Sequence, residues 1–246
     1  MKPFLIFLSA SLLLLGCTDS KKETDNTASF SDNATTQFTK IPATSSNIDF
    51  QNTLGETFEF NFLIYPNIYI GAGVAVGDID NDGLEDIYFA ANFDDNRLYK
   101  NIGDFQFEDI SSSSNTTGPS GFPTGVSMLD INNDGWLDIY VCRAGSLRDH
   151  EGRRNLLYIN QKDGTFSEQA KQWGLDDPGF STQAYSIDYD KDGDLDLYLV
   201  NHRYDFNNTA KLSGEIQSRI EEITSDQLYR NDGTQFTKVT GDARLS

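Results

Sequence analysis

A nine-residue acidic loop occurs three times in this chain, each time between two short apolar segments. Positions 1, 3, 5 and 9 carry side-chain oxygens, and position 6 is always glycine. Carboxylates this close together repel one another unless a hard cation lies among them. The loops run from Asp78 to Asp86, from Asp130 to Asp138 and from Asp188 to Asp196. The sequence therefore predicts three calcium sites.

The expected ligands occupy the same positions in each loop. Side chains at positions 1, 3 and 5 should face the ion, position 7 should offer its main-chain carbonyl, and the position-9 carboxylate should bind through both oxygens. Glycine at position 6 permits the positive φ of a sharp reversal. The predicted metal ligands are Asp78, Asp80, Asp82, Leu84 and Asp86; Asp130, Asn132, Asp134, Trp136 and Asp138; and Asp188, Asp190, Asp192, Asp194 and Asp196.

Three other interpretations of the loops compete with calcium sites of this type: an EF-hand, a magnesium site and a metal-free turn. An EF-hand needs glutamate at position 12, where this chain has Phe89, Val141 or Leu199. Magnesium is the second candidate ion, but its strict octahedral geometry suits these loops less well. Asn132 removes one charge from the second loop, so we expect weaker binding there. A single loop of this kind could be a metal-free turn, whereas three in register favour metal.

Four short apolar segments surround each loop and are expected to be strands. The segment that leaves the loop is apolar on both faces, so it needs cover on both sides. Ile87, Ile139 and Leu197 share one face, and Tyr88, Tyr140 and Tyr198 share the other. The third segment reads Leu-Tyr-x-Asn, and the fourth begins with phenylalanine. Four strands per unit, repeated every fifty to sixty residues, predict an all-β fold of stacked β-propeller blades.

The repeats occupy residues 38–246, as units at about 71–112, 121–172 and 179–240. The segment from Phe38 to Ile41 repeats the fourth-strand signature and is predicted to be a velcro-type strand that closes the last blade. Propellers have about four to eight blades, and only three units here carry loops. We therefore expect the propeller to be incomplete and the chain to be an N-terminal fragment, with a small or open assembly as the alternative.

The N-terminal residues predict export. Residues 1–16 have a short basic start and an apolar stretch too short to span a membrane, as in a signal peptide. Cys17 follows a small residue, as in a bacterial lipobox, so we expect it to be lipidated and to anchor the protein in the outer membrane or at the cell surface. An ordinary secretory signal is the alternative. Residues 17–37 are polar and predict a disordered tether.

Charge and cysteine content narrow the possible functions. The 246 residues include 38 acidic and 19 basic side chains, giving a net charge of −19. Such a protein should not attract nucleic acid or anionic lipid, so membrane contact is expected through the lipid anchor alone. Cys142 ends an apolar strand and is expected to be a buried small hydrophobe. With Cys17 acylated, the chain could form no intramolecular disulfide.

Basic and aromatic residues gather in the insertions between the second and third strands. In a four-stranded meander these insertions lie at the opposite end of the strands from the acidic loops. They predict a face that binds an acidic glycan or a carboxylate-bearing protein loop. The alternative is a solvated loop that pairs with nearby acids such as Asp149 and Glu151. The residues of this predicted ligand face are Arg143, Arg148, His150, Arg153, Arg154, His202, Arg203 and Tyr204.

With these motifs in view, the chain resembles the FG-GAP/VCBS repeat family, the calcium-binding propellers also found in integrin α-subunits. The likeness rests on the acidic loops, Leu-Tyr-x-Asn, the glycine-rich run from Gly71 to Asp78 and the turn from Asp163 to Phe166. More closely, it resembles the bacterial cartilage-acidic-protein-like lipoproteins, which often carry an ASPIC/UnbV module. The Phe-Gly and Gly-Ala-Pro signature itself is only loosely present. The resemblance implies a binding or adhesion module with structural calcium.

These observations favour a lipid-anchored, calcium-stabilised propeller that binds a protein or glycan at the bacterial cell envelope. A secreted propeller enzyme acting on polysaccharide is one alternative, and a structural subunit of an envelope complex is another. Catalysis needs a positioned acid–base pair or an activated nucleophile. The chain has only two histidines and no Gly-x-Ser-x-Gly or His-Glu-x-x-His motif. We therefore expect no enzymatic activity.

Overall fold

The computed structural model describes residues 38–58, 60–63, 65–119, 121–145, 149–202 and 221–241. The chain divides into residues 1–40 and residues 41–246, and the strands all lie in the second unit. The predicted signal peptide, tether and lipidated Cys17 fall outside the described residues. Among the described residues, no helix is long and apolar enough to cross a membrane.

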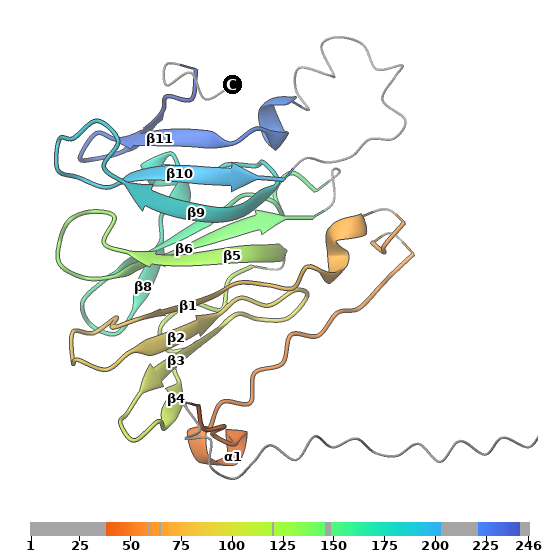
Figure 1. Ribbon diagram of the computed structural model, residues 1–246, viewed down its shortest axis with the longest axis vertical. Coiled ribbons are helices and arrows are strands. Elements are labelled where there is room, and N and C mark those ends of the chain that lie inside the picture. Colours follow the sequence, from red (N-terminus) through yellow and green to blue (C-terminus); the bar gives the residue numbers. More distant parts are fainter. Residues whose placement is uncertain are drawn as a thin grey trace, which may run out of the picture. The chain divides into compact units, whose positions relative to one another are not determined.

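Within the described residues, twelve strands form three four-stranded antiparallel sheets, each a simple meander (Figure 1). Each sheet holds one acidic loop between its first and second strands. Sheet 1 comprises β1 (Val74–Gly77), β2 (Asp86–Phe89), β3 (Arg97–Asn101) and β4 (Phe107–Asp109). Sheet 2 comprises β5 (Phe122–Leu129), β6 (Asp138–Ala144), β7 (Leu156–Asn160) and β8 (Phe166–Glu168). Sheet 3 comprises β9 (Ser181–Ile187), β10 (Asp196–Asn201), β11 (Gln227–Asn231) and β12 (Phe236–Lys238). The sheets have the topology expected of propeller blades.

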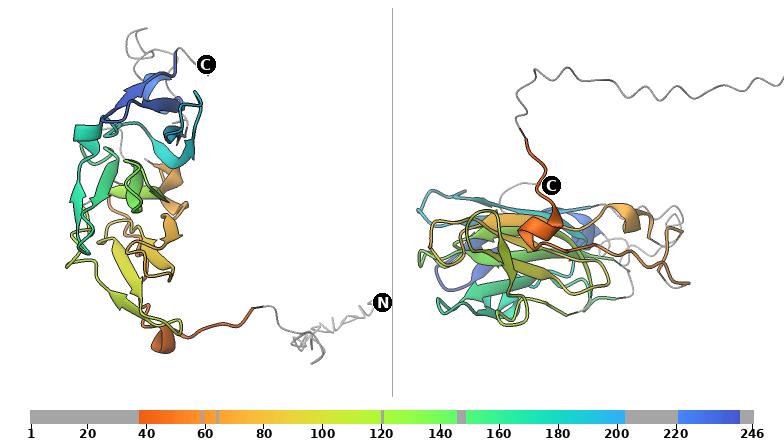
Figure 2. Two further views of the ribbon diagram at one scale, coloured as in Figure 1. Left: turned by 90° about the vertical axis from the view of Figure 1, so that its left-hand side faces the viewer. Right: turned by 90° about the horizontal axis from the view of Figure 1, so that it is seen from below.

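The second strand of each sheet is apolar on both faces, as predicted. Tyr88 of β2 and Ile139 of β6 belong to one buried cluster between sheets 1 and 2. Tyr140 of β6 and Leu197 of β10 belong to another, between sheets 2 and 3. Neighbouring sheets therefore bury each other's faces, in chain order (Figure 2).

Close approach of the first strands depends on glycine and short polar side chains. A Cβ on Gly125 of β5 would lie 2.1 Å from the carbonyl oxygen of Thr182 in β9, so only glycine fits there. Beside it, the hydroxyl of Ser127 donates to the carbonyl of Ala184 over 2.7 Å. The first strands of sheets 2 and 3 therefore pack almost backbone to backbone.

The predicted velcro strand is not formed. Residues 38–41 have no strand structure, and Phe38 is 88% exposed. The three sheets of the described residues each have their own fourth strand, namely β4, β8 or β12, and this segment pairs with none of them. The short helix α1 (Ala43–Ser46) follows this segment instead.

The described residues between 47 and 70 form no strand either. The ring of Phe50 stacks on Phe89 of β2 with 4.7 Å between centroids, and the Tyr99 hydroxyl donates to Asp49 over 2.9 Å. The chain then continues into the 3-10 helix η1 (Pro66–Tyr69). A second short helix, α2 (Ala170–Trp173), follows β8. Residues 47–52 thus cover part of sheet 1 without joining its hydrogen-bond ladder.

Candidate metal centres

All three acidic loops adopt the same sharp reversal. The position-6 glycines have positive φ, as predicted: 86° at Gly83, 84° at Gly135 and 100° at Gly193. Position 4 is also left-handed, with φ of 59° at Asn81, 56° at Asn133 and 67° at Lys191. Asparagine tolerates this conformation well, whereas lysine does so less readily. The sequence pattern had pointed to the glycine alone.

Main-chain amides tie the loop carboxylates in place. The two oxygens of Asp78 accept from the amides of Asp82 and Gly83 over 3.1 and 2.8 Å. Asp130 makes the equivalent bonds with Asp134 and Gly135 over 2.9 and 2.8 Å. At position 5, each carboxylate accepts from the position-7 amide. These bonds hold positions 1 and 5 toward the interior of the loop.

The position-9 carboxylates have a structural role that the sequence did not reveal. Asp86, Asp138 and Asp196 are fully buried at the start of each second strand. One oxygen of Asp86 accepts from the Ile79 amide over 3.0 Å, and the other accepts from Asn101 over 2.7 Å. The same pair of bonds recurs at Asp138 and Asp196. The position-9 carboxylate therefore connects its loop to the third strand. Each of its two oxygens accepts one hydrogen bond and has a second lone pair that could coordinate a cation.

Carboxylate oxygens converge in the first and third loops. One oxygen each from Asp78, Asp80 and Asp86 lies within 4.8 Å of the others, and Asp188, Asp190 and Asp196 repeat the arrangement. In the second loop the corresponding residues are Asp130, Asn132 and Asp138. Positions 1, 3 and 9 thus come together in the first and third loops.

Two oxygens in these loops are buried and accept no hydrogen bond. They are Oδ1 of Asp80 and Oδ1 of Asp194, at positions 3 and 7. A buried acceptor without a partner is costly, and a hard cation would satisfy it. The donor set is entirely oxygen, which is the set that calcium prefers. The residues present therefore fit a calcium ion.

Burial and mutual repulsion make the ionised loops unfavourable in the absence of a cation. Burial raises the pKa of Asp86 to about 6, against the opposing hydrogen bonds from Ile79 and Asn101. Burial likewise raises the pKa of Asp138 to about 7. In the third loop, burial and the nearby Asp192 raise the pKa of Asp194 to about 6. A bound cation would favour the ionised form of each group.

Basic side chains approach the three loops to different extents. The Lys100 ammonium contacts Asp80 and lies 3.6 Å from Asp82 in the first loop. Lys162 lies 3.3 Å from Asp134 in the second loop. In the third unit, Arg230 instead pairs with Asp232, outside the loop, over 2.8 Å. Among the three loops, the carboxylates of the first loop therefore have a basic side chain closest to them, namely that of Lys100.

Adjacent sheets are linked through the third strand and the preceding loop. The side-chain amide of Asn160, at the end of β7, donates to the carbonyl of Ile79 in the first loop over 2.8 Å. Asn231, at the end of β11, donates to the carbonyl of Ile131 in the second loop over 3.2 Å. The Leu-Tyr-x-Asn motif predicts a third strand in each unit. The motif alone does not predict that its asparagine bonds to the loop of the preceding sheet.

The predicted ligand face does not form as expected, because its central arginines are interior. Arg143 is 2% exposed and Arg153 is fully buried. Arg153 stacks on the ring of Phe180 with 4.7 Å to its centroid, and its Nε donates to the carbonyl of Pro178 over 3.0 Å. Both side chains are enclosed by the strand ends and the insertion itself, so they hold this part of the fold together.

The remaining residues of that face are paired, partly buried or outside the described residues. Arg154 pairs with Glu151 at 3.1 Å and with Asp176 at 2.8 Å, as the solvated-loop alternative expected. His150 lies 3.2 Å from Arg153. The His202 ring packs against Phe180, and burial lowers its pKa. The predicted residues Arg148, Arg203 and Tyr204 lie outside the described residues.

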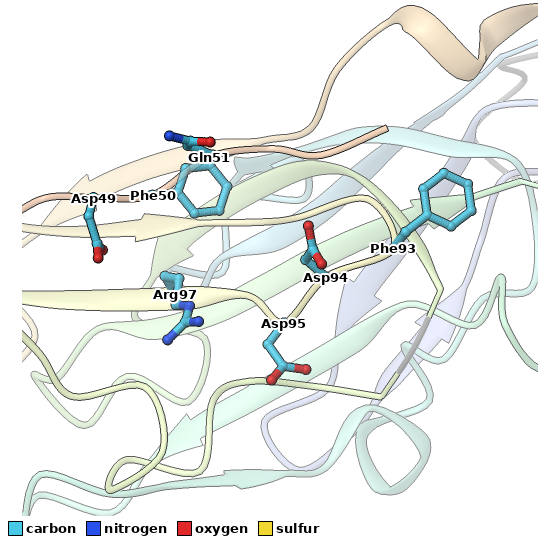
Figure 3. Close-up of a pocket in the computed structure, with 7 residues that line it drawn as sticks. All are labelled: Asp49, Phe50, Gln51, Phe93, Asp94, Asp95 and Arg97. Carbon is cyan, nitrogen blue, oxygen red and sulfur yellow. The ribbon is translucent and has the colours of Figure 1, made fainter. Parts of the chain in front are cut away.

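A groove of about 360 Å³ lies beside sheet 1, between residues 49–51 and the connection from β2 to β3 (Figure 3). Asp49, Asp94 and Asp95 give it an acidic lining, and Phe50 and Phe93 supply apolar walls. Its one basic residue, Arg97, is already paired with Asp109 at 2.9 Å. This groove cannot be predicted from local sequence patterns, because it depends on a contact between segments about forty residues apart.

Comparison with known proteins gives two findings. Residues 78–141 and 146–199 match the FG-GAP-like repeat. Cartilage acidic protein 1 of Xenopus tropicalis is 29% identical over 134 residues, covering 54% of this chain and 20% of the relative. The human protein of that name is 27% identical over 190 residues, covering 71% of this chain and 27% of the relative. The chain thus spans about a quarter or less of the length of these relatives.

Proposed function

Because this chain carries FG-GAP-like repeats, we propose that it is a calcium-stabilised propeller module for binding or adhesion. Calcium would be held by the carboxylates of the three loops and would have a structural role, fixing the reversals at one end of the sheets. The partner is a protein or a glycan. In this proposal the chain is exported and held at the bacterial envelope by lipid on Cys17.

One observation carries the calcium part of the proposal. Positions 1, 3 and 9 of the first and third loops bring carboxylate oxygens within 4.8 Å of one another, at equivalent places in two sheets. Without a cation, like charges so placed oppose folding. With a cation, the same oxygens would link the first, second and third strands of each sheet. Calcium would therefore supply stability, and its removal would loosen the module.

Binding is favoured over catalysis by the arrangement of the charged groups. The loop carboxylates accept main-chain amides, and in this proposal they also serve as metal ligands. Of the two histidines, His150 contacts Arg153, and His202 packs among aromatic rings. We therefore favour a module that binds a partner over one that catalyses a reaction.

Calcium titration tests the first part of the proposal. The melting temperature of the purified protein, followed by circular dichroism, should rise with calcium and return to its starting value with chelator. Magnesium at the same concentration serves as the comparison, and we expect a smaller rise. No change with either ion would refute a structural role for calcium.

Anchoring and ligand binding need separate measurements. Mass spectrometry of protein from a bacterial host should find acyl groups on Cys17, and Cys17→Ser should release the protein from membranes. A glycan array and a pulldown from envelope extracts, each with and without chelator, should show calcium-dependent capture. Turnover of polysaccharide in the same samples would instead support an enzyme.

A further inference from the structure

The three buried position-9 carboxylates are joined by one chain of hydrogen bonds that crosses the three described sheets. Each step of the chain passes through an asparagine at the end of a third strand. From sheet 1 to sheet 3 it runs through Asp86, Ile79, Asn160, Asp138, Ile131, Asn231 and Asp196. Because each position-9 carboxylate is also a predicted metal ligand, the chain connects the three candidate metal centres.

The step between sheets 1 and 2 shows how the connection is made. The main-chain amide of Ile79 donates to Asp86 over 3.0 Å, and the carbonyl of Ile79 accepts from the side chain of Asn160 over 2.8 Å. The main-chain amide of Asn160 then donates to Asp138 over 2.8 Å. Two residues, one from each sheet, therefore lie between the position-9 carboxylates of the first and second loops.

The step between sheets 2 and 3 repeats this arrangement at the same positions. The main-chain amide of Ile131 donates to Asp138 over 3.1 Å, and the carbonyl of Ile131 accepts from the side chain of Asn231 over 3.2 Å. The main-chain amide of Asn231 donates to Asp196 over 2.9 Å. Asp138 therefore takes part in both steps, with one carboxylate oxygen in each.

Water has little access to this chain of bonds. The three carboxylates are fully buried, and the four residues between them are at most 4% exposed. Hydrogen bonds in such surroundings are stronger than in water, and a carbonyl that loses its donor there cannot turn to solvent. A loop that changes its conformation therefore disturbs the next sheet, and a loop that keeps its conformation holds its neighbour in place.

We propose that neighbouring loops bind calcium cooperatively, because Asn160 and Asn231 transmit the order of one loop to the next. This inference rests on the calcium role in the proposed function. In an empty loop the carboxylates repel one another, so its conformation is less restricted. In a filled loop the position-9 carboxylate is fixed, and with it the peptide unit at position 2. The asparagine then holds the ligands of the next loop in order, so binding there costs less conformational entropy.

Electrostatic repulsion between bound ions opposes this coupling. Two cations in adjacent loops repel each other, which weakens the binding of the second. Salt screens that repulsion where it acts through solvent, whereas it screens buried hydrogen bonds far less. Cooperativity that comes from the hydrogen bonds should therefore persist or increase as the salt concentration rises.

The first two loops share a further contact. The side chain of Asn81, at position 4 of the first loop, donates to the carbonyl of Gly135 in the second loop over 3.1 Å. Asn133 occupies position 4 of the second loop, and within the described residues it makes no equivalent bond to Gly193 of the third. We therefore expect stronger coupling between the first and second loops than between the second and third.

The test measures calcium binding at the second loop of the full chain by the fluorescence of Trp136, with Trp173→Phe removing the other tryptophan. Asp80→Ala disables the first loop and should weaken calcium binding at the second loop by about tenfold. Glu85→Gln is the matched control, because it removes the same charge from an exposed position of the first loop that is not a predicted ligand. It should weaken binding by less than about twofold.

Asparagine variants identify the route of the coupling. In an Asn160→Ala background, Asp80→Ala should change the calcium affinity of the second loop by less than about threefold. Asn160→Ala keeps the main-chain amide that donates to Asp138, so the second loop can still bind. In an Asn231→Ala background the tenfold effect should remain, because Asn231 connects the second loop to the third. Melting curves would show that each variant is folded at the temperature of the titration.

The second and third loops allow an equivalent test, which applies even if Asn160→Ala does not fold. Asp190→Ala disables the third loop and should weaken calcium binding at the second loop by about fivefold, and Asn231→Ala should remove this effect.

The possible outcomes separate this inference from the proposed function. Coupling that is lost only when the connecting asparagine is replaced supports the inference. A calcium affinity of the second loop that does not depend on its neighbours overturns the inference and leaves a structural role for calcium intact. Coupling that survives replacement of the connecting asparagine does the same. A second loop that binds no calcium overturns the inference together with the calcium part of the proposed function.

Discussion

The side-chain amide of Asn160 donates to the main-chain carbonyl of Ile79, which lies 81 residues earlier in the chain and in the neighbouring sheet, over 2.8 Å. The same amide also donates to Leu137 in its own loop over 3.1 Å. One asparagine thus joins two acidic loops and two sheets. The spacing of the sheets and the conformation of the loops are therefore coupled.

Asn160→Ala should lower the free energy of unfolding by about 2–3 kcal/mol. The reason is that the main-chain carbonyls of Ile79 and Leu137 both lose the side-chain amide that donates to them. Urea denaturation followed by circular dichroism measures the change. Asn101→Ala is the matched control, since the side chain of Asn101 bonds to Glu85 and Gly103 in its own unit and, among the described residues, to no other sheet. This control substitution should cost about 1 kcal/mol. Equal losses in both variants would argue against coupling between sheets.

Asn132→Asp should raise calcium affinity at the second loop on the order of tenfold, because it restores a ligand charge at position 3. Trp136 lies in the same loop and is partly buried, so its fluorescence reports binding there. Asn133→Asp adds the same charge at the exposed position 4 and serves as the control. If both variants tighten binding equally, overall charge and not the ligand set is responsible.

Lys100→Met should raise calcium affinity at the first loop by about threefold to tenfold. The ammonium contacts Asp80 and Asp82, so a cation entering the loop must displace it or share the same oxygens. Calorimetry would isolate this site in a background where Asp130→Asn and Asp188→Asn weaken the other loops. Lys238→Met, which removes a lysine paired with Glu222 at 3.8 Å, is the control. Unchanged affinity after Lys100→Met would show that this lysine does not compete with the ion.

Without divalent ions, the melting temperature should fall as the pH rises from about 4 to about 7. The pKa of Asp86 is raised to about 6 and that of Asp138 to about 7 in the folded protein. A carboxyl that holds its proton more tightly when folded stabilises the fold at low pH, and this contribution is lost as it ionises. Excess calcium should flatten the slope. Calorimetric scans after treatment with chelating resin would test this, and a metal-free melting temperature that rises over the window would contradict it.

Arg153→Ala should lower the free energy of unfolding by about 2–4 kcal/mol, because it removes a fully buried side chain and leaves the Pro178 carbonyl without its donor. Arg154→Ala removes a pairing at the surface with Glu151 and Asp176 and should cost less than about 1 kcal/mol. Chemical denaturation of the two variants compares these roles. A stable Arg153→Ala protein that has lost ligand capture would restore this residue to a binding face.

The sequence by itself determined the local features of this protein. Glycine is predicted at the turns, for example at Gly83, because other residues are strained at positive φ. The second strands are predicted to be apolar on both faces because side chains alternate along a strand, as Ile87 and Tyr88 do. The hairpin turn at Gly164 was predicted for the same reason, and its φ is 86°. These features depend on neighbours within a few residues, so the printed order of the residues is enough to predict them.

Only the tertiary structure decided which residues meet across the sheets. Asn231 reaches the carbonyl of Ile131, 100 residues away, because two sheets stack in a fixed register. Arg153 looked like a surface residue in a basic insertion, but the Phe180 ring and the Pro178 carbonyl enclose it. Phe38 has the local signature of a strand, yet it is exposed and joins none of the three described sheets. Burial and pairing depend on the surfaces that packing brings together, which local sequence spacing does not specify.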